Sequence, residues 1–346
     1  MKHLIITISI LIILFKTGNV LSETDIFNVN NVEVNKEISK NKEKLIDQAF
    51  LKAYDKLINR LLLDKDYKKV SEISLKEIKK LIRYYQIIRP NKNENNNFKV
   101  NISFDKERVH EFFYLNNILY SDITDTEVLI FPLLKKETNY YAYTKNYFYE
   151  NWSKKDFQNL IQYNLPVENI ESLQKITLNE NNIYKIDISD FFKEYEKENV
   201  IFAIIEIKKN STEVFLNTRI EGKKIKKTLS VLKDKQKDEE MNNKIVIEKT
   251  NEIIADLIKM QNLIDVRTPS FLNVEIKLSN KSSLVEFDKR LKNIDLIDTY
   301  YVQQLNKDFV LIKIKYLGKI KKIIDKLKEQ NINLKMTNGQ WQIIIT

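Results

Sequence analysis

The chain of 346 residues contains no cysteine. A disulfide framework, a lipid-modified cysteine and thiol chemistry are therefore excluded, so stability must come from the burial of apolar side chains. Hydrophobic residues make up 43% of the sequence and charged residues 31%, which is typical of a folded globular protein. At this length we expect two or three domains.

Glycine and histidine are almost as scarce, with four and two residues respectively. Gly222, Gly318 and Gly339 are isolated, so there is no glycine-rich loop of the kind that surrounds a phosphate with backbone amides. Beyond the first few residues only His110 remains, and one imidazole cannot build a histidine-rich metal site or a histidine-dependent triad. We therefore expect no catalytic residues, no cofactor and no metal site.

Residues 1–22 are typical of a secretory signal peptide. Lys2 gives a positive start, Leu4 to Phe15 form an apolar run, and cleavage is expected between Ser22 and Glu23. The apolar run is shorter than the about 20 residues of a membrane-spanning helix, and no later segment supplies one. We expect a secreted, periplasmic bacterial protein that is soluble or peripheral to a membrane; an uncleaved N-terminal anchor is the alternative.

The formal net charge of +10 would normally indicate nucleic acid, an anionic membrane surface or an acidic polymer as a partner. Lysine, asparagine and isoleucine are abundant along the whole chain, however, which is typical of an AT-rich genome and weakens this indication. An exported chain rarely meets nucleic acid, and no base-reading motif is present. We expect envelope proteins as partners, an anionic membrane surface as a further candidate, and no nucleic acid.

Apolar periodicity predicts an N-terminal α/β domain over residues 23–136. The expected elements are a strand at 26–34, a helix at 42–63, a helix after Ser74 that ends at Leu81, a hairpin of strands 84–89 and 98–104, a helix at 106–115 and a buried strand at 127–133. The order β-α-β-β-α-β is that of a ferredoxin-like unit.

A middle α/β domain over 137–266 and a C-terminal domain over 267–346 are expected to follow. In the middle domain, helical spacing runs from Trp152 to Ile161, and antiparallel strands are predicted at 200–207, 213–220 and 223–231, covered by a helix at 241–263. The C-terminal domain repeats the β-α-β-β-α-β order, with elements at 271–278, 283–291, 294–305, 309–316, 319–329 and 333–345. The predicted fold class is α+β, with ferredoxin-like βαββαβ units flanking a middle α/β layer that contains antiparallel strands.

Asp187 and Asp190 are the nearest approach to a pair of catalytic carboxylates. Such a pair is what a glycosidase requires, so a carboxylate-dependent glycan or peptidoglycan hydrolase is our second functional hypothesis. The favoured alternative is structural: Asp187 or Ser189 caps a helix that contains Phe191, and Asp190 lies in its first turn.

Two groups of residues are candidates for an interaction surface. Exposed tyrosine and tryptophan side chains are effective anchors at interfaces, and lysines at a strand edge either discourage aggregation or attract an anionic surface. Core or sheet packing is the favoured alternative for the aromatic group, and a solvated face is the alternative for the lysines. The candidates are Tyr140, Tyr141, Tyr143, Tyr147, Trp152, Lys223, Lys224, Lys226 and Lys227.

Short motifs run through the chain in an order that resembles a family of exported bacterial proteins, domain of unknown function 2066. They are the helix end Tyr54 to Leu61, the strand Val100 to Asp105, the strand Leu129 to Pro132, and Leu165-Pro166. Similar sequences carry an acidic pair shortly after the Leu-Pro step, where this chain has Asn169 and Ser172. The resemblance implies a compartment and an architecture but no activity. Our leading hypothesis is a non-enzymatic binding or assembly module of the cell envelope.

Overall fold

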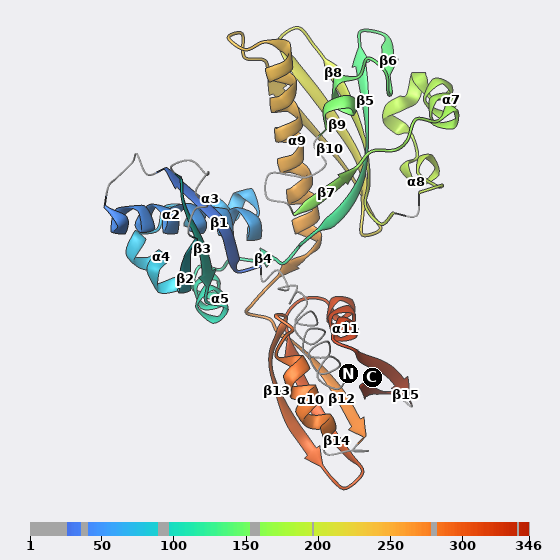
Figure 1. The fold of residues 1–346 in the computed structure, drawn as a ribbon. Coiled ribbons are helices and arrows are strands. Elements are labelled where there is room, and N and C mark those ends of the chain that lie inside the picture. The colour runs from blue at the N-terminus through green and yellow to red at the C-terminus, as the bar shows by residue number, and fades with distance from the viewer. Residues whose placement is uncertain are drawn as a thin grey trace, which may run out of the picture. The chain divides into compact units, whose positions relative to one another are not determined.

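The computed structural model describes residues 26–35, 41–88, 97–152, 160–195, 197–277, 282–337 and 339–345. The chain is α+β, as predicted, and small α/β units stand before and after a middle layer in the sequence (Figure 1). It divides into two compact units, Met1–Ala53 with Leu75–Val109, and Tyr54–Ser74 with His110–Thr346.

The first unit contains a three-stranded antiparallel sheet in the order β1-β3-β2. Alternate residues of β1 (Asn28–Asn35) are buried, and a bulge at Asn31 separates Val29 from Val32 and keeps both in the core. The remaining strands are β2 (Ile82–Ile88) and β3 (Asn97–Phe104), and the helices that begin in this unit are α2 (Lys42–Leu61), α4 (Leu75–Leu81) and α5 (Lys106–Leu115). These elements agree with the predicted ones to within two residues at almost every boundary.

The second unit is built around a six-stranded mixed sheet in the order β10-β9-β8-β5-β6, with β7 paired to β5. The three strands β8, β9 and β10 are antiparallel, as predicted, and the turn between the last two places Glu221 and Gly222 at positive φ angles of 46° and 79°. The strands are β5 (Thr126–Lys136), β6 (Asn139–Tyr141), β7 (Ile161–Asn164), β8 (Val200–Ile207), β9 (Ser211–Ile220) and β10 (Lys223–Leu232).

Strand β5 lies elsewhere than the sequence analysis expected. We predicted that it closes the N-terminal sheet, but it pairs in parallel with β7 and β8. Its residues from Val128 to Leu134 are all buried, so the strand needs apolar cover on both faces. A three-stranded sheet with helices on one side cannot supply that cover, whereas the middle layer does. The predicted helical spacing up to Ile161 also ends differently, because Ile161 begins β7; residues 153–159 lie outside the described residues.

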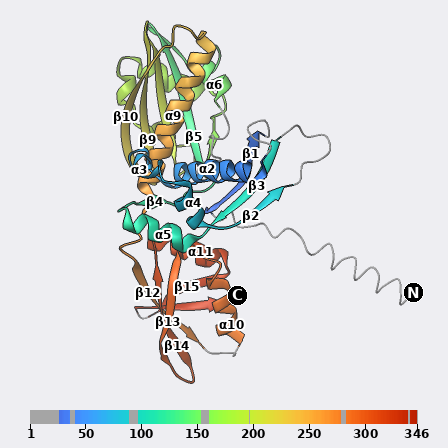
Figure 2. The same ribbon diagram turned by 90° about the vertical axis from the view of Figure 1, so that its left-hand side faces the viewer.

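Helices cover the two faces of the six-stranded sheet. The long helix α9 (Glu239–Gln261) lies along one face, as predicted, and packs on Ile201, Ala203 and Leu216 (Figure 2). The other face carries α7 (Ile170–Leu178), the 3-10 helix η2 (Glu180–Lys185) and α8 (Ile188–Phe191), over a core of aromatic rings. The short helix α6 (Tyr147–Asn151) lies on the α9 side instead, where its buried Phe148 belongs to the same core as the apolar residues of α9.

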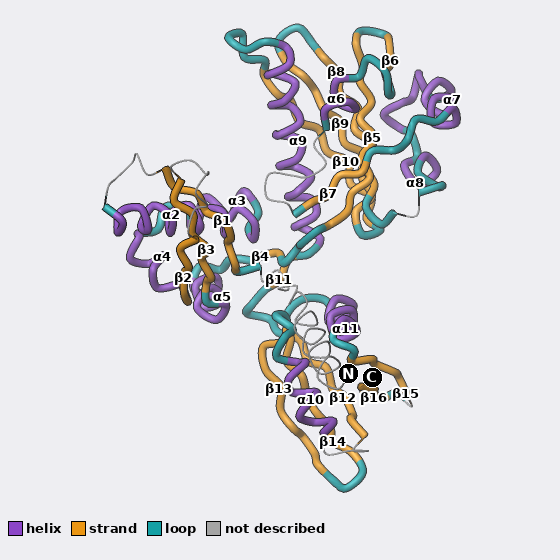
Figure 3. The backbone as a smooth tube through the Cα atoms, viewed as in Figure 1, coloured by secondary structure: helices purple, strands orange, loops and turns teal. Residues whose placement is uncertain are grey.

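The C-terminal part forms a five-stranded sheet in the order β13-β14-β12-β16-β15. Its first three strands and its two helices follow the predicted order, but the closing stretch is a hairpin of two strands around Gly339, at a φ of 78° (Figure 3). Strand β16 consequently runs parallel to β12. The elements are β12 (Ser270–Lys277), α10 (Ser282–Leu291), β13 (Ile297–Leu305), β14 (Phe309–Tyr316), α11 (Ile320–Glu329), β15 (Ile332–Thr337) and β16 (Gln340–Ile345).

A buried lysine ties α9 to the segment that precedes α3 (Asp64–Val70). The Nζ of Lys259 donates hydrogen bonds to the carbonyl oxygens of Asn59 and Leu62, at 2.6 and 2.9 Å. These carbonyls lie at the C-terminal end of α2, where the helix dipole favours a cation. Just after α9, the short strand β11 (Leu263–Ile264) pairs antiparallel with β4 (Tyr120–Ser121).

The predicted signal peptide, with its cleavage site at Ser22 and Glu23, lies outside the described residues. Within the ranges that are described, no helix is both long enough and apolar enough to span a membrane.

Candidate functional site

The aromatic part of the predicted interaction surface belongs largely to the core. Tyr143 and Trp152 are buried, and each packs edge-on against another ring, Tyr143 on Phe131 and Trp152 on Tyr163. This corrects the sequence-based assignment of Tyr143 and Trp152, because burying two large rings on the sheet stabilises more than exposing them. Tyr140, Tyr141 and Tyr147 are half-buried and border the same cores.

The lysine part of that surface is exposed. Lys223, Lys224, Lys226 and Lys227 all lie on β10, which is the edge strand of the six-stranded sheet. Lys224 forms an ion pair of 3.2 Å with Asp187. Among the described strands β10 pairs only with β9, so these exposed lysines lie on an edge strand.

Asp187 has the structural role that the sequence favoured. Its carboxylate accepts a hydrogen bond of 2.8 Å from the backbone N–H of Ser189 and caps α8. That backbone hydrogen bond, followed by the one from Lys224, lowers the pKa of Asp187. Asp190 is exposed in the first turn of the helix. A carboxyl with a lowered pKa is not suited to act as the general acid of a glycosidase.

His110 packs beside a buried tyrosine. Its Nε2 lies 3.0 Å from the hydroxyl of Tyr120, and burial raises the pKa of that tyrosine well above its ordinary value. Among the described residues, no group of histidine and carboxylate side chains is arranged to hold a metal ion.

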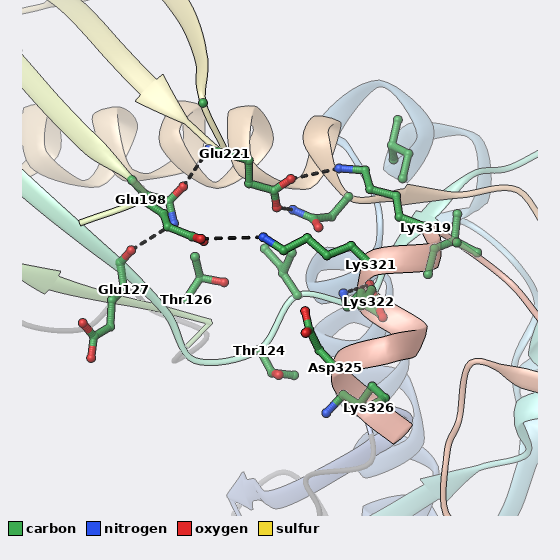
Figure 4. A pocket seen from close by; sticks show the side chains of 18 of the residues that line it. Thr124, Thr126, Glu127, Glu198, Glu221, Lys319, Lys321, Lys322, Asp325 and Lys326 are labelled. Atoms are coloured by element: carbon green, nitrogen blue, oxygen red, sulfur yellow. Dashed lines mark hydrogen bonds and ion pairs between the residues drawn. The ribbon is translucent and has the colours of Figure 1, made fainter. Parts of the chain in front are cut away.

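A cavity of about 1160 Å³ lies in the second unit, between one end of the six-stranded sheet and α11 (Figure 4). The strand ends bring acids and one arginine to it, the turn Glu221-Gly222 closes one side, and α11 supplies a row of lysines. The charged lining residues are Asp122, Glu127, Lys197, Glu198, Arg219, Glu221, Lys319, Lys321, Lys322, Asp325, Lys326 and Glu329. Acids and bases are equal in number among these residues, so the wall is highly charged and close to neutral.

Ion pairs across the cavity connect α11 to the sheet. Lys322 pairs with Asp122, whose side chain is nearly buried, and Lys319 pairs with Glu221 at 2.9 Å. Burial would raise the pKa of Glu221, but hydrogen bonds from Lys319 and Asn262 outweigh that effect, so the pKa is lowered. The pair of Lys321 and Glu198 is longer, at 3.7 Å, and exposed.

Arg219 differs from the other cations of the cavity. Its Nη2 donates a hydrogen bond of 3.2 Å to the carbonyl oxygen of Lys197, while Lys197 itself pairs with Glu127. In the part of the chain that the structure describes, no carboxylate pairs with the Arg219 guanidinium. Because a guanidinium carries five N–H donors, Arg219 keeps donors for an anionic group in the cavity.

Sequence reasoning did not find this cavity. The sequence predicted the two strands that flank Glu221-Gly222 and the helix at 319–329 as separate local elements in different domains. The partners that meet here are 98 residues apart for Glu221 and Lys319, and 200 residues apart for Asp122 and Lys322. No local pattern reports contacts at such separations.

No protein-family model and no curated protein matches the chain. Among solved structures, a lipoprotein from Neisseria meningitidis, GNA1162, is 11% identical with a TM-score of 0.20, and the match covers 37% of this chain and 96% of that one. A structure described as an uncharacterized protein is 9% identical with a TM-score of 0.15, and the match covers 40% and 93%.

Proposed function

We propose that the protein is a non-enzymatic binding or assembly module of the bacterial cell envelope, and that the cavity beside α11 binds an anionic group of its ligand. The observation that supports this function is Arg219, which lines the cavity without a carboxylate partner among the described residues. The signal-like N-terminus and the resemblance to family 2066 fit the same assignment.

The charge arrangement favours recognition over chemistry. Four acids of the wall are already paired with lysines: Asp122, Glu127, Glu198 and Glu221. The hydrogen bonds from Lys319 and Asn262 lower the pKa of Glu221, so Glu221 is a poor proton donor near neutral pH. A carboxylate or phosphate of a ligand would instead meet the planar fork of Arg219, which forms bidentate hydrogen bonds to such groups.

Calorimetric titration with citrate and with inorganic phosphate tests this function. We expect wild type to bind at least one of the two anions, and Arg219→Gln to weaken binding by about tenfold or more, the effect of losing a charge-assisted bidentate contact. Lys235→Gln is the matched control, because Lys235 is exposed in a turn and does not line the cavity. Equal affinity in wild type and Arg219→Gln would remove the cavity from the proposal.

The enzymatic alternative requires a separate assay. Wild type is incubated with purified peptidoglycan and with a glycan mixture, and soluble fragments are measured. We expect no fragments above the level of a heat-inactivated sample. Release of fragments by wild type but not by Asp187→Asn or Asp190→Asn would contradict the non-enzymatic function.

The exposed lysines of β10 favour a second candidate function, peripheral attachment to an anionic lipid surface. Lys223, Lys224, Lys226 and Lys227 lie within five residues of one edge strand, and each lysine near a membrane contributes about 1 kcal/mol of attraction. Vesicles that contain phosphatidylglycerol test it. Binding that falls steeply with salt, and is lost when the four lysines are changed to glutamine, would support attachment; binding that does not depend on these lysines would exclude it.

A further inference from the structure

The outward face of α7 carries an unusual set of exposed apolar side chains. Val167, just before the helix, is 80% exposed, and Ile170, Leu173 and Leu178 are 74%, 44% and 85% exposed. Large aliphatic side chains are seldom so exposed as neighbours on a soluble protein, and contiguous apolar patches usually mark an interaction site. We call these four residues the α7 surface.

The inward face of α7 is the less apolar of the two. Ser172 and Ile176 are its buried residues, and successive residues of a helix are about 100° apart, which places Ile170 and Leu178 on the opposite side. The position of the helix is well defined, because the Asn169 side chain caps it through a hydrogen bond of 2.7 Å from the Ser172 N–H. The apolar side is therefore turned away from the sheet by the way that the helix is anchored.

Acidic groups surround the α7 surface. The segment from Val167 to Tyr195 contains six acids and three lysines, a net charge of −3 in a chain of net charge +10. Contacts hold the two ends of this segment together: the Asn169 Nδ2 lies 3.3 Å from the Tyr195 hydroxyl, and the Lys175 Nζ lies 3.5 Å from the carbonyl oxygen of Asp190. The surface is thus apolar at its centre with a net negative border, although one of the six acids, Asp187, is paired with Lys224 of β10 at 3.2 Å.

Two of the border acids are held close together. A hydrogen bond joins the carboxyl groups of Glu171 and Glu194, which lowers the pKa of Glu171 and raises that of Glu194. Lys175 already forms an ion pair of 3.1 Å with Glu171, and its charge also acts on Glu194. One lysine faces two carboxyls here, so a cation of a partner would reduce the repulsion between them further.

We infer that the α7 surface is the docking site for a partner protein that presents an apolar segment bordered by lysine or arginine. Charge complementarity selects this occupant. An anionic membrane would be repelled by the acidic border, and a second copy placed symmetrically on the same surface would bring acid against acid. The surface is separate from the cavity of the proposed function, because none of its residues lines that cavity.

A fluorescent amphipathic peptide of leucine and lysine, about five helical turns long, is a defined probe for this surface. We expect full-length wild type to bind it, and the double variant Ile170→Ser/Leu178→Ser to bind at least about tenfold more weakly, because two exposed aliphatic contacts are lost. Val285→Ser, which changes a similarly exposed aliphatic residue on α10, is the matched control and should bind like wild type. Unchanged affinity in the double variant would overturn the inference.

The charge requirement has its own readout. Binding should weaken as salt rises from about 0.05 to 0.5 M, and a peptide of leucine and glutamate should not bind. Three outcomes would overturn the inference. In the first, the two peptides bind equally well, and in the second, phosphatidylglycerol vesicles bind wild type but not the double variant. The third is a dimer of wild type, seen by light scattering, that the double variant does not form. Arg219→Gln should bind the basic peptide as wild type does. A failure of the α7 docking inference can therefore be distinguished from a failure of the cavity proposal.

Discussion

Helices α7 and α11 are two short amphipathic helices of the second unit that expose opposite faces. In α11 the apolar side chains of Ile323 and Leu327 are completely buried, and lysines face the solvent. In α7 the apolar side chains of Ile170 and Leu178 face the solvent instead. A helical period in the sequence therefore reports that an apolar face exists, but it does not report what covers that face.

The space beneath each helix explains the difference. Helix α11 crosses a small sheet whose strand β15 has few other neighbours, so the helix must supply the apolar cover there. Helix α7 lies over the part of the middle sheet where Phe131, Phe191 and Phe202 already pack ring against ring. Those rings fill the core, so α7 needs to contribute little more than Ile176.

Truncation of one leucine in each helix should show the largest contrast. Leu327→Ala leaves a cavity in a filled core. It should lower the free energy of unfolding by about 2–5 kcal/mol, which is usual for buried leucines. Leu178→Ala should change it by less than about 0.5 kcal/mol, as at other exposed positions. Urea unfolding measures both, and similar losses in the two variants would show that α7 is covered in solution.

The ion pairs of α11 should contribute different amounts to stability, because they differ in burial. Lys322→Met leaves the nearly buried Asp122 without its partner and should cost about 2 kcal/mol, less than the loss for a fully buried pair because Lys322 is partly solvated. Lys321→Met removes an exposed pair of 3.7 Å on the same helix and should cost between 0 and about 0.5 kcal/mol. Equal urea midpoints for the two variants would contradict the burial argument.

The residue before the first turn of α7 should contribute more to the free energy of unfolding than the residue before the first turn of α11. Asn169→Ala removes a side-chain cap and should cost about 1 kcal/mol, whereas α11 begins after Lys319 without a side-chain cap. Lys319→Ala should therefore cost no more than about 0.5 kcal/mol, the value of its largely exposed pair with Glu221. The comparison fails if Asn169→Ala unfolds at the same urea concentration as wild type.

The smallest expected effect is a pH dependence at the α11 cavity. The folded-state pKa of Glu221 is lowered, so its stabilising contribution is complete above the unfolded pKa of about 4.3 and is lost as the pH falls through the lower folded value. Between about pH 5 and pH 3, wild type should lose slightly more stability than Glu221→Gln. Parallel pH profiles of the urea midpoint for the two proteins would contradict the assignment.

Most secondary structure could be predicted because it depends on local patterns. The strands β8 and β14 and the helix α5 have the predicted boundaries, and the turn at Glu221-Gly222 follows from residues that tolerate positive φ. The short elements α3, α6 and α7 were missed, because each is held by a few contacts rather than by a long apolar stripe. The cap at Asn146, whose side chain also bonds the Pro132 carbonyl oxygen at 2.8 Å, is one such contact.

The candidate sites were less predictable. The lysines of β10 were identified correctly as exposed, since an edge strand tolerates charge on its outer positions. At Tyr143 and Trp152 the favoured alternative, core packing, holds and the interaction-surface assignment does not, because an aromatic side chain suits a core as well as an interface and only its neighbours decide between them. The cavity and the α7 surface had no local signal at all.

The sequence by itself determined the α+β class, the alternation of strands and helices, and the lack of thiol and glycine-loop chemistry, while the compartment stays a prediction. Each of these depends on which residues are present or on spacings of a few residues. The tertiary structure alone decided that β5 joins the middle sheet, that Arg219 lacks a carboxylate partner among the described residues, and that α7 turns its apolar side outward. These features depend on side chains far apart in the chain competing for the same buried space, and a local pattern contains no information about that competition.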